Sequence, residues 1–204
     1  MTFARVIGRL IKPIGRAMDW TPLAVAVPAM IALAVAAGIE PVSVAATIRL
    51  GALLLGAAAG FALVDPVPVV TPVPRWVRQW LRTLLAFVAA AAAWCAMFAV
   101  FASRAAPGAG FGGYALEAAV CLSAGLACTA VVVLRRADRV AGAVGAAVLL
   151  ALAASTFFYE GRVWPLPEEP DWSAVHQGWL VALPIPVLVL TMANGWAERV
   201  MASA

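Results

Sequence analysis

The chain has 204 residues, of which 65% are hydrophobic and only 12% are charged. So little polar sequence excludes a sizeable water-soluble domain, and we expect one transmembrane domain over residues 1–204. A formal net charge of +4 would suggest a nucleic-acid partner in a soluble protein. Here membrane topology and anionic lipid explain the positive charge, so we expect membrane lipid as a partner and no nucleic acid.

Residues 1–20 are predicted to form an amphipathic helix that lies in the membrane interface. Apolar residues fall on one face of this helix and basic residues on the other, namely Arg5, Arg9, Lys12 and Arg16. A helix with two such faces lies flat on a bilayer surface. We expect Pro13 to bend or break it, because a proline inside a helix removes a hydrogen bond and clashes with the preceding turn. The alternative is an unordered flank that only sets the topology.

Six apolar runs are each long enough to cross a bilayer as a helix. They fall at about 22–39, 45–64, 83–102, 114–134, 140–158 and 178–197. A hydrocarbon core of about 30 Å requires roughly 20 apolar helical residues, with about 17 as a lower limit. The sequence therefore predicts an all-α integral membrane protein with six transmembrane helices.

The basic residues alternate between the two sides of this map. Three lie on one side, at Arg49, Arg104 and Arg162, and the other eleven lie on the side of the N-terminus: Arg5, Arg9, Lys12, Arg16, Arg75, Arg78, Arg82, Arg135, Arg136, Arg139 and Arg199. Positive residues resist translocation, so both termini are expected in the cytoplasm. Seven of the eight tryptophans fall at or near predicted interfaces, where indole rings gather.

Arginine outnumbers lysine thirteen to one, and alanine is abundant. This usage is typical of a GC-rich bacterial genome, so we expect a multi-pass protein of the bacterial cytoplasmic (inner) membrane.

Three features lie inside the predicted spans. The second run contains Gly56-Ala-Ala-Ala-Gly60, and such small residues let two helices pack closely. Arg49 and Glu117 lie near the outer ends of their spans, and ionisable residues there are costly and often functional. They are candidates for contact with a transported substrate, and the alternatives are a structural ion pair or side chains that reach to the interface.

Two connections are longer than tight turns require. Residues 65–82 have four prolines in the first half and three arginines in the second, so we expect a rigid segment followed by a basic helix. The outer connection 159–177 is acidic and rich in proline. It either shields a transport path or is a solvated loop.

No enzymatic motif is present, and we expect no catalytic residue, no metal site and no cofactor. The chain lacks a phosphate-binding loop, a nucleophile elbow and a metalloprotease motif. His176 is the only histidine, which excludes two-histidine haem ligation within the chain. The cysteines Cys95, Cys121 and Cys128 form no C-x-x-C pair, and we interpret them as small apolar residues.

An interfacial N-terminal helix, six spans, a long inner link after the second span and a long outer link before the sixth together resemble the membrane subunits of ABC-2-type transporters. Phe61-Ala-Leu-Val-Asp-Pro66 followed by Thr71-Pro-Val-Pro-Arg75 is also similar to a run in small actinobacterial ABC permease-like proteins. In that family the link after the second span meets the ATPase. The resemblance therefore implies ATPase contacts at Asp65, Pro66, Thr71, Pro72, Pro74 and Arg75.

The function that the resemblance implies is that of a permease subunit, which forms part of a translocation pathway. Its partners would be a separate ABC ATPase subunit and a second permease chain, identical or homologous. The alternative is a non-catalytic accessory or scaffold subunit of a larger bacterial membrane complex. A small secondary carrier is a third reading, but the two halves show no obvious inverted repeat.

Overall fold

The computed structural model describes residues 3–37, 41–64, 74–102, 111–135, 138–156, 158 and 163–201. Within these ranges the chain forms eight α-helices and no strand, which confirms the all-helical prediction. In chain order they are α1 (Phe3–Ala17), α2 (Thr21–Ala36), α3 (Pro41–Phe61), α4 (Arg75–Ala102), α5 (Phe111–Val133), α6 (Arg139–Thr156), α7 (Trp172–Ala182) and α8 (Pro184–Met201).

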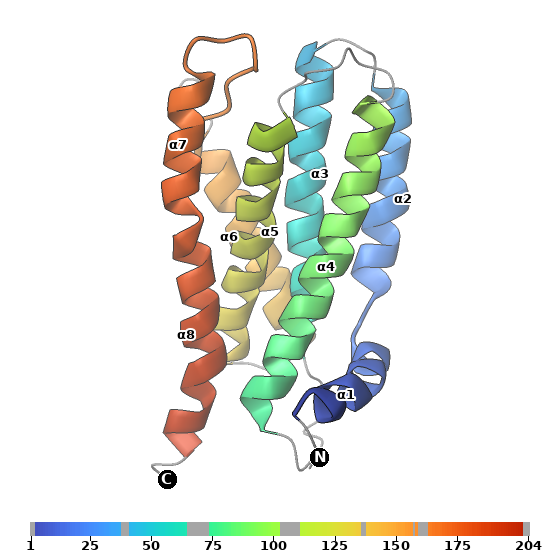
Figure 1. The fold of residues 1–204 in the computed structure, drawn as a ribbon, viewed down its shortest axis with the longest axis vertical. Helices are drawn as coiled ribbons and strands as arrows, with labels where there is room; N and C mark the ends of the chain where they lie inside the picture. Colours follow the sequence, from blue (N-terminus) through green and yellow to red (C-terminus); the bar gives the residue numbers. More distant parts are fainter. Residues whose placement is uncertain are drawn as a thin grey trace.

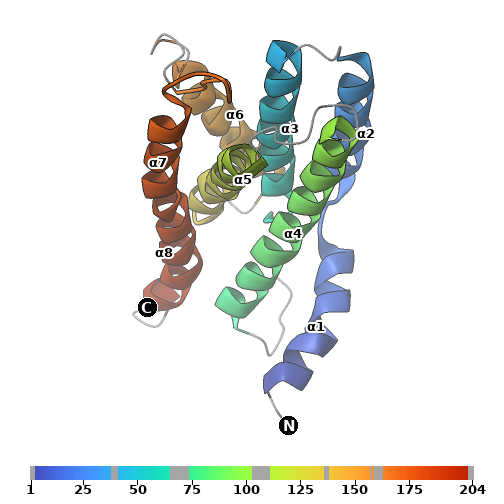
Figure 2. The ribbon, with the colours of Figure 1, turned by 45° about the horizontal axis from the view of Figure 1, so that its top comes forward.

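The helices from α2 to α8 run along the long axis of one bundle, with α7 and α8 following each other as a nearly continuous rod (Figure 1). Helix α5 is the centre of the bundle, since it packs against α3, α4, α6, α7 and α8. The turned view shows α5 between α3 and α4 on one side and the α7–α8 rod on the other (Figure 2). Helix α1 and the end of α8 lie at the same end, which we call the α1 end (Figure 1).

Four helices in the described part are long and apolar enough to cross a membrane. They span Val42–Phe61, Arg75–Ala102, Phe111–Val133 and Trp172–Gly195. A fifth is obtained if the bent pair Leu10–Ala17 and Thr21–Ala36 counts as one span. Helix α6 is apolar but shorter. These four or five helices indicate a multi-pass membrane protein.

Helix α1 forms where the amphipathic pattern predicts it, but the break expected at Pro13 is wrong. The helix continues through Pro13 to Ala17, and the chain bends by 77° between this helix and α2. Ile14 and Met18 are buried against the bundle, and this packing offsets the hydrogen bond that the proline removes. Lys12 and Arg16 are exposed, whereas the side chains of Arg5 and Arg9 lie outside the described part.

The glycines of α3 form a packing face, as predicted, and their partner is α5 of the same chain. A methyl group on Gly56 would lie 2.6 Å from the carbonyl oxygen of Cys121, and one on Gly125 would collide with the carbonyl of Gly56. A methyl group on Gly60 would collide with the hydroxyl of Thr129. The two backbones therefore touch, which only glycine permits here.

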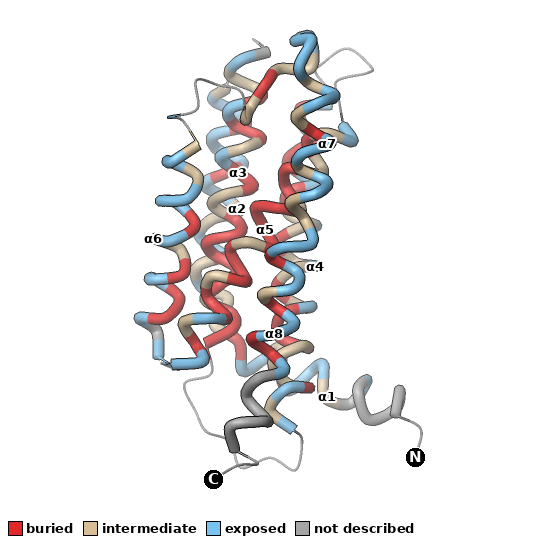
Figure 3. Tube along the Cα trace, turned by 90° about the vertical axis from the view of Figure 1, so that its left-hand side faces the viewer, coloured by how far each residue is buried: buried red, intermediate tan, exposed pale blue. Residues whose placement is uncertain are grey.

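Buried positions gather on the sides of the helices that face the bundle interior, while α6 and the α7–α8 rod carry many exposed positions outward (Figure 3). The exposed side chains are largely apolar, including Val144, Leu152, Leu180, Val181 and Leu188. Apolar residues on the outer face of a helical bundle suit contact with lipid chains.

Candidate functional site

Arg49 of α3 and Glu117 of α5 form a buried, bidentate ion pair at the end of the bundle opposite α1. Arg49 Nε donates to Glu117 Oε2 at 2.8 Å, and Nη2 donates to Oε1 at 3.0 Å. The glutamate is only 2% exposed. Two of the alternatives for these residues are thus resolved: they form a structural ion pair, and neither side chain reaches freely to the interface. Contact with a substrate remains a prediction.

Arg49 also holds the segment that precedes α7. Its Nη1 donates to the carbonyl of Trp164 at 3.0 Å, and Nη2 donates to the carbonyl of Pro165. The guanidinium carbon lies 5.4 Å from the ring centroid of Trp164 and 5.5 Å from that of Tyr114. Rings at this distance attract the cation through their π faces. One arginine therefore ties α3, α5 and residues 163–165 together.

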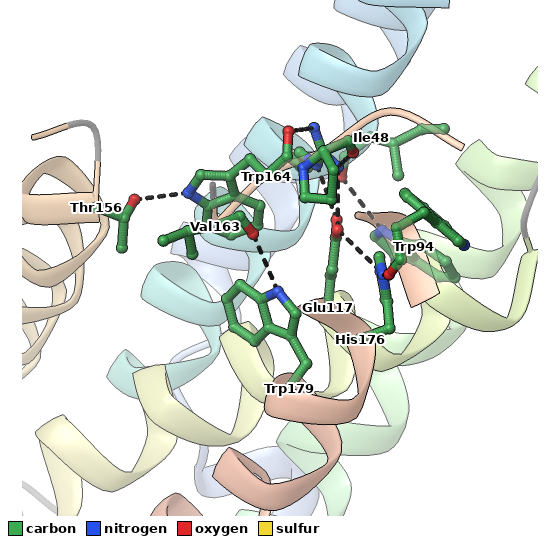
Figure 4. Close-up of polar contacts among 11 residues, drawn as sticks. Ile48, Trp94, Glu117, Thr156, Val163, Trp164, His176 and Trp179 are labelled. Atoms are coloured by element: carbon green, nitrogen blue, oxygen red, sulfur yellow. Dashed lines mark hydrogen bonds and ion pairs between the residues drawn. The ribbon is translucent and has the colours of Figure 1, made fainter. Parts of the chain in front are cut away.

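His176 of α7 completes what we call the Arg49 cluster, made of Arg49, Glu117 and His176. Its Nδ1 lies 2.7 Å from the carbonyl oxygen of Trp172, and its Nε2 lies 3.1 Å from Glu117 Oε1. Figure 4 shows Glu117 and His176 pointing toward each other. A methyl group on Gly113 would lie 2.8 Å from Nε2, so this glycine makes room for the imidazole.

Hydrogen bonds of two tryptophans fasten the same segment to α6 and α7. Trp164 Nε1 donates to Thr156 Oγ1 of α6 at 2.6 Å, and Trp179 Nε1 donates to the carbonyl of Val163 at 3.1 Å (Figure 4). Both indoles therefore satisfy their N–H groups on the protein. We call residues 163–167 with these contacts the cap.

A second polar arrangement, the Arg82 clamp, lies at the α1 end. Arg82 of α4 is 3% exposed, and its Nη1 donates to the carbonyl oxygens of Val64 at 2.9 Å and Ala62 at 3.4 Å. Gln79 Nε2 donates to the carbonyl of Leu63 at 3.2 Å. These carbonyls directly follow the last residue of α3, at the end of the helix that favours a positive charge. The clamp joins α4 to the last residues before the long link.

The predicted ATPase-contact residues fall mostly outside the described part, namely Asp65, Pro66, Thr71 and Pro72. Pro74 is exposed and its carbonyl accepts from the Arg78 amide at 3.3 Å, so it begins the first turn of α4. Arg75 is the first residue of α4. The contact with an ATPase stays a prediction.

A small cavity lies between α4, α5 and α8 among the described residues. It has room for about one water molecule and is lined by Arg75, Gln79 and Asn194 among apolar residues of α5 and α8. Among these described residues, no three His, Cys, Asp or Glu side chains are grouped to hold a metal ion.

The sequence offered the ion pair as one of several alternatives for Arg49 and Glu117, and it did not indicate the two residues that complete these arrangements. His176 was considered only as a lone histidine, although Trp172 and His176 are four residues apart and so share a helix face. Arg82 was interpreted only as one of the basic residues that set the membrane topology, although it follows the link closely and lies in α4 with Arg75 and Arg78. Comparison with known proteins adds no relative: no family model, no curated protein and no solved structure matches this chain.

Proposed function

We propose that this chain is the permease subunit of an ATP-driven, ABC-type transporter of the bacterial cytoplasmic membrane, coupled to a separate ATPase chain. The observation that carries the proposal is the Arg82 clamp. Any force on the link between α3 and α4 acts on two helices whose ends are fastened together by Arg82 and Gln79.

The link is suited to transmit such a force. Residues 65–74 contain four prolines, which restrict the backbone and make a segment stiff. Helix α1 packs against α4 at the same end, and α4 is tied to α8 where Asn194 Nδ2 donates to Thr83 Oγ1 at 3.3 Å. A push on the link would therefore tilt α3 and α4 and be felt by α8.

The finer topology belongs to this proposal: six crossings, with both termini in the cytoplasm. In support, α1, the Arg82 clamp and the end of α8 share one end of the bundle (Figure 1), and the sequence concentrates eleven of its fourteen basic residues on that side. Helices α2 and α6 have 16 and 18 residues. These lengths are close to the lower limit of about 17 residues for a membrane crossing.

The translocation pathway would form between this chain and a second permease chain. In the described bundle α3 and α5 are in backbone contact, which leaves no room for a path between these two helices and favours a path between two chains. Arg49 and Glu117 would line the path only in a conformation in which the cap has moved, because both are now engaged with each other.

One observation favours the accessory-subunit alternative: hydrogen bonds fasten the cap to α3, α6 and α7. A variant that uncouples ATP hydrolysis from transport distinguishes the permease from the accessory subunit. In a reconstituted complex, Pro72→Gly with Pro74→Gly should leave insertion intact while ATP hydrolysis no longer drives transport, because the link becomes flexible. Pro167→Gly in the cap segment serves as a control that changes a proline at the opposite end. Equal effects of both changes would contradict the lever.

A further inference from the structure

We propose that the small cavity between α4, α5 and α8 binds one water molecule, which donates a hydrogen bond to Asn194 Oδ1 and ties α8 to the start of α4. The observation that carries this inference is a buried amide oxygen on a residue that lines a cavity of the right size. The inference does not depend on whether the chain transports, because it rests on the surroundings of Asn194 alone.

The side chain of Thr83 fixes which end of the Asn194 amide is left over. Thr83 Oγ1 lies 2.8 Å from the backbone carbonyl oxygen of Gln79, which can only accept a hydrogen bond. The hydroxyl hydrogen is therefore used there, and toward Asn194 the hydroxyl oxygen can only accept. Asn194 Nδ2, at 3.3 Å, is the donor that this arrangement requires. The end of the amide that remains for another partner is Oδ1.

Asn194 Oδ1 is buried and accepts no hydrogen bond from the described residues. Asn194 is only 2% exposed, so bulk water has almost no access to it. An amide oxygen in such a place loses its hydration without compensation. Buried polar groups are almost always paired with the protein or with ordered water. A small hydrogen-bond donor is therefore expected next to Oδ1.

The cavity provides the space for that donor. It has room for about one water molecule, and Asn194 lines it together with Arg75 and Gln79 of α4. The rest of its wall consists of apolar side chains of α5 and α8, with Ala130 of α5 among them. Water is a donor that fits this volume, whereas a whole lipid headgroup is too large for it.

A water molecule in this cavity has partners on two helices. Its hydrogens can go to Asn194 Oδ1 on α8 and to Gln79 Oε1 on α4, because Gln79 Nε2 already donates to the carbonyl of Leu63. The guanidinium of Arg75 has donors only and can donate to the water oxygen. About three hydrogen bonds are usual for a buried water. The water would thus join α8 to the residue of α4 that also holds the segment after α3.

NMR of the full-length protein tests the water directly, because Asn194 is the only asparagine in the chain. Protein labelled with ¹⁵N-asparagine in lipid nanodiscs therefore gives a single side-chain amide. We expect this amide to show cross-peaks to water of opposite sign in nuclear Overhauser and rotating-frame spectra, as a long-lived bound water produces and chemical exchange does not. No such cross-peak to water, or one to lipid headgroup hydrogens in its place, would overturn the proposal.

A matched pair of variants shows whether the signal comes from the cavity. Ala130→Val enlarges a side chain of the cavity wall and should remove the cross-peak, because the water is displaced. Ala118→Val makes the same change at another buried position of α5 and should keep it. A cross-peak that persists in Ala130→Val, or that is lost in both variants, would contradict the assignment to this cavity.

A third variant tests whether the water stabilises the bundle through Asn194. Ala130→Thr has the shape of Ala130→Val but carries a hydroxyl that can donate to Oδ1 in place of the displaced water. We expect the thermal midpoint in mild detergent to fall by about 2–4 °C in Ala130→Val and by less in Ala130→Thr. Burial alone favours valine over threonine, so this order is expected only if Oδ1 needs a donor. A midpoint of Ala130→Val equal to or above that of Ala130→Thr would contradict the proposal.

Discussion

Arg82 and Val64 are eighteen residues apart in the sequence, yet the Arg82 guanidinium donates to the Val64 carbonyl at 2.9 Å from a nearly fully buried position. Val64 is the last described residue before the link, and Arg82 lies in the second turn of the helix that follows it. The two sides of the link are therefore mechanically joined inside the bundle. A buried cation with backbone carbonyls as its partners is costly to disturb.

Removing the clamp should destabilise the bundle. Arg82→Met leaves buried carbonyls without a donor, and we expect the free energy of unfolding to fall by about 1.5–3 kcal/mol. Arg75→Met, at a less buried position of the same helix, should change it by less than about 0.5 kcal/mol. Equilibrium unfolding in mild detergent measures both. Equal losses for the two variants would contradict a special contribution of the Arg82 clamp to stability.

The Arg49–Glu117 pair should show strong coupling in a double-mutant cycle. Glu117→Leu leaves a buried guanidinium without its carboxylate and should cost about 3–5 kcal/mol. Arg49→Met with Glu117→Leu removes both charges, and its cost should be clearly smaller than the sum of the two single changes. The cycle is measured by the same unfolding assay. Additive losses would mean that the two charges do not stabilise each other.

Gly125→Ala and Gly178→Ala should act in opposite directions. A methyl group at Gly125 collides with the Gly56 carbonyl on α3, whereas one at Gly178 on α7 meets no atom within 4 Å. We expect Gly125→Ala to destabilise by about 1–3 kcal/mol, as overpacking does. Gly178→Ala should stabilise by about 0.5–1 kcal/mol, because alanine favours a helix. Thermal unfolding in detergent compares them, and a tolerated Gly125→Ala would contradict the close contact of α3 and α5.

The predicted sidedness can be checked by labelling single cysteines in intact cells, in a background without Cys95, Cys121 and Cys128. A cysteine in place of Glu168, which is exposed next to the cap, should react with a membrane-impermeant reagent. A cysteine in place of Thr71 should react only after the cells are opened. The reverse pattern would mean that the topology is inverted. Labelling of both positions from outside would contradict the predicted topology.

Hydropathy and helical periodicity predicted the elements of this fold well, because a bilayer imposes length and apolarity on every crossing. The predicted run at 140–158 became α6 at Arg139–Thr156, and the glycine face of α3 was recognised from its spacing. Of the bend or break predicted at Pro13, the break is wrong. Local rules favour a break there, but the buried side chains of Ile14 and Met18 hold the last turn of α1 against the bundle.

The partners of polar side chains were much harder to predict. Arg49 and Glu117 were singled out because each is an ionisable residue in an apolar run, yet nothing local indicated that they would meet. His176 reaches Glu117 only because α7 packs on α5, and Arg82 meets Val64 only because the chain reverses between α3 and α4. Such contacts depend on helix packing, which the pattern of a single helix does not contain.

Copurification tests the coupling to an ATPase most directly. The full-length protein, tagged and extracted from its native membrane in a mild detergent, should bring down a separate chain that carries a phosphate-binding loop, as identified by mass spectrometry. Crosslinks from position 71 or 74 should reach that chain, while crosslinks from position 168 should not. Recovery without any ATPase, together with subunits of another complex crosslinked elsewhere, would contradict the permease proposal and favour an accessory subunit.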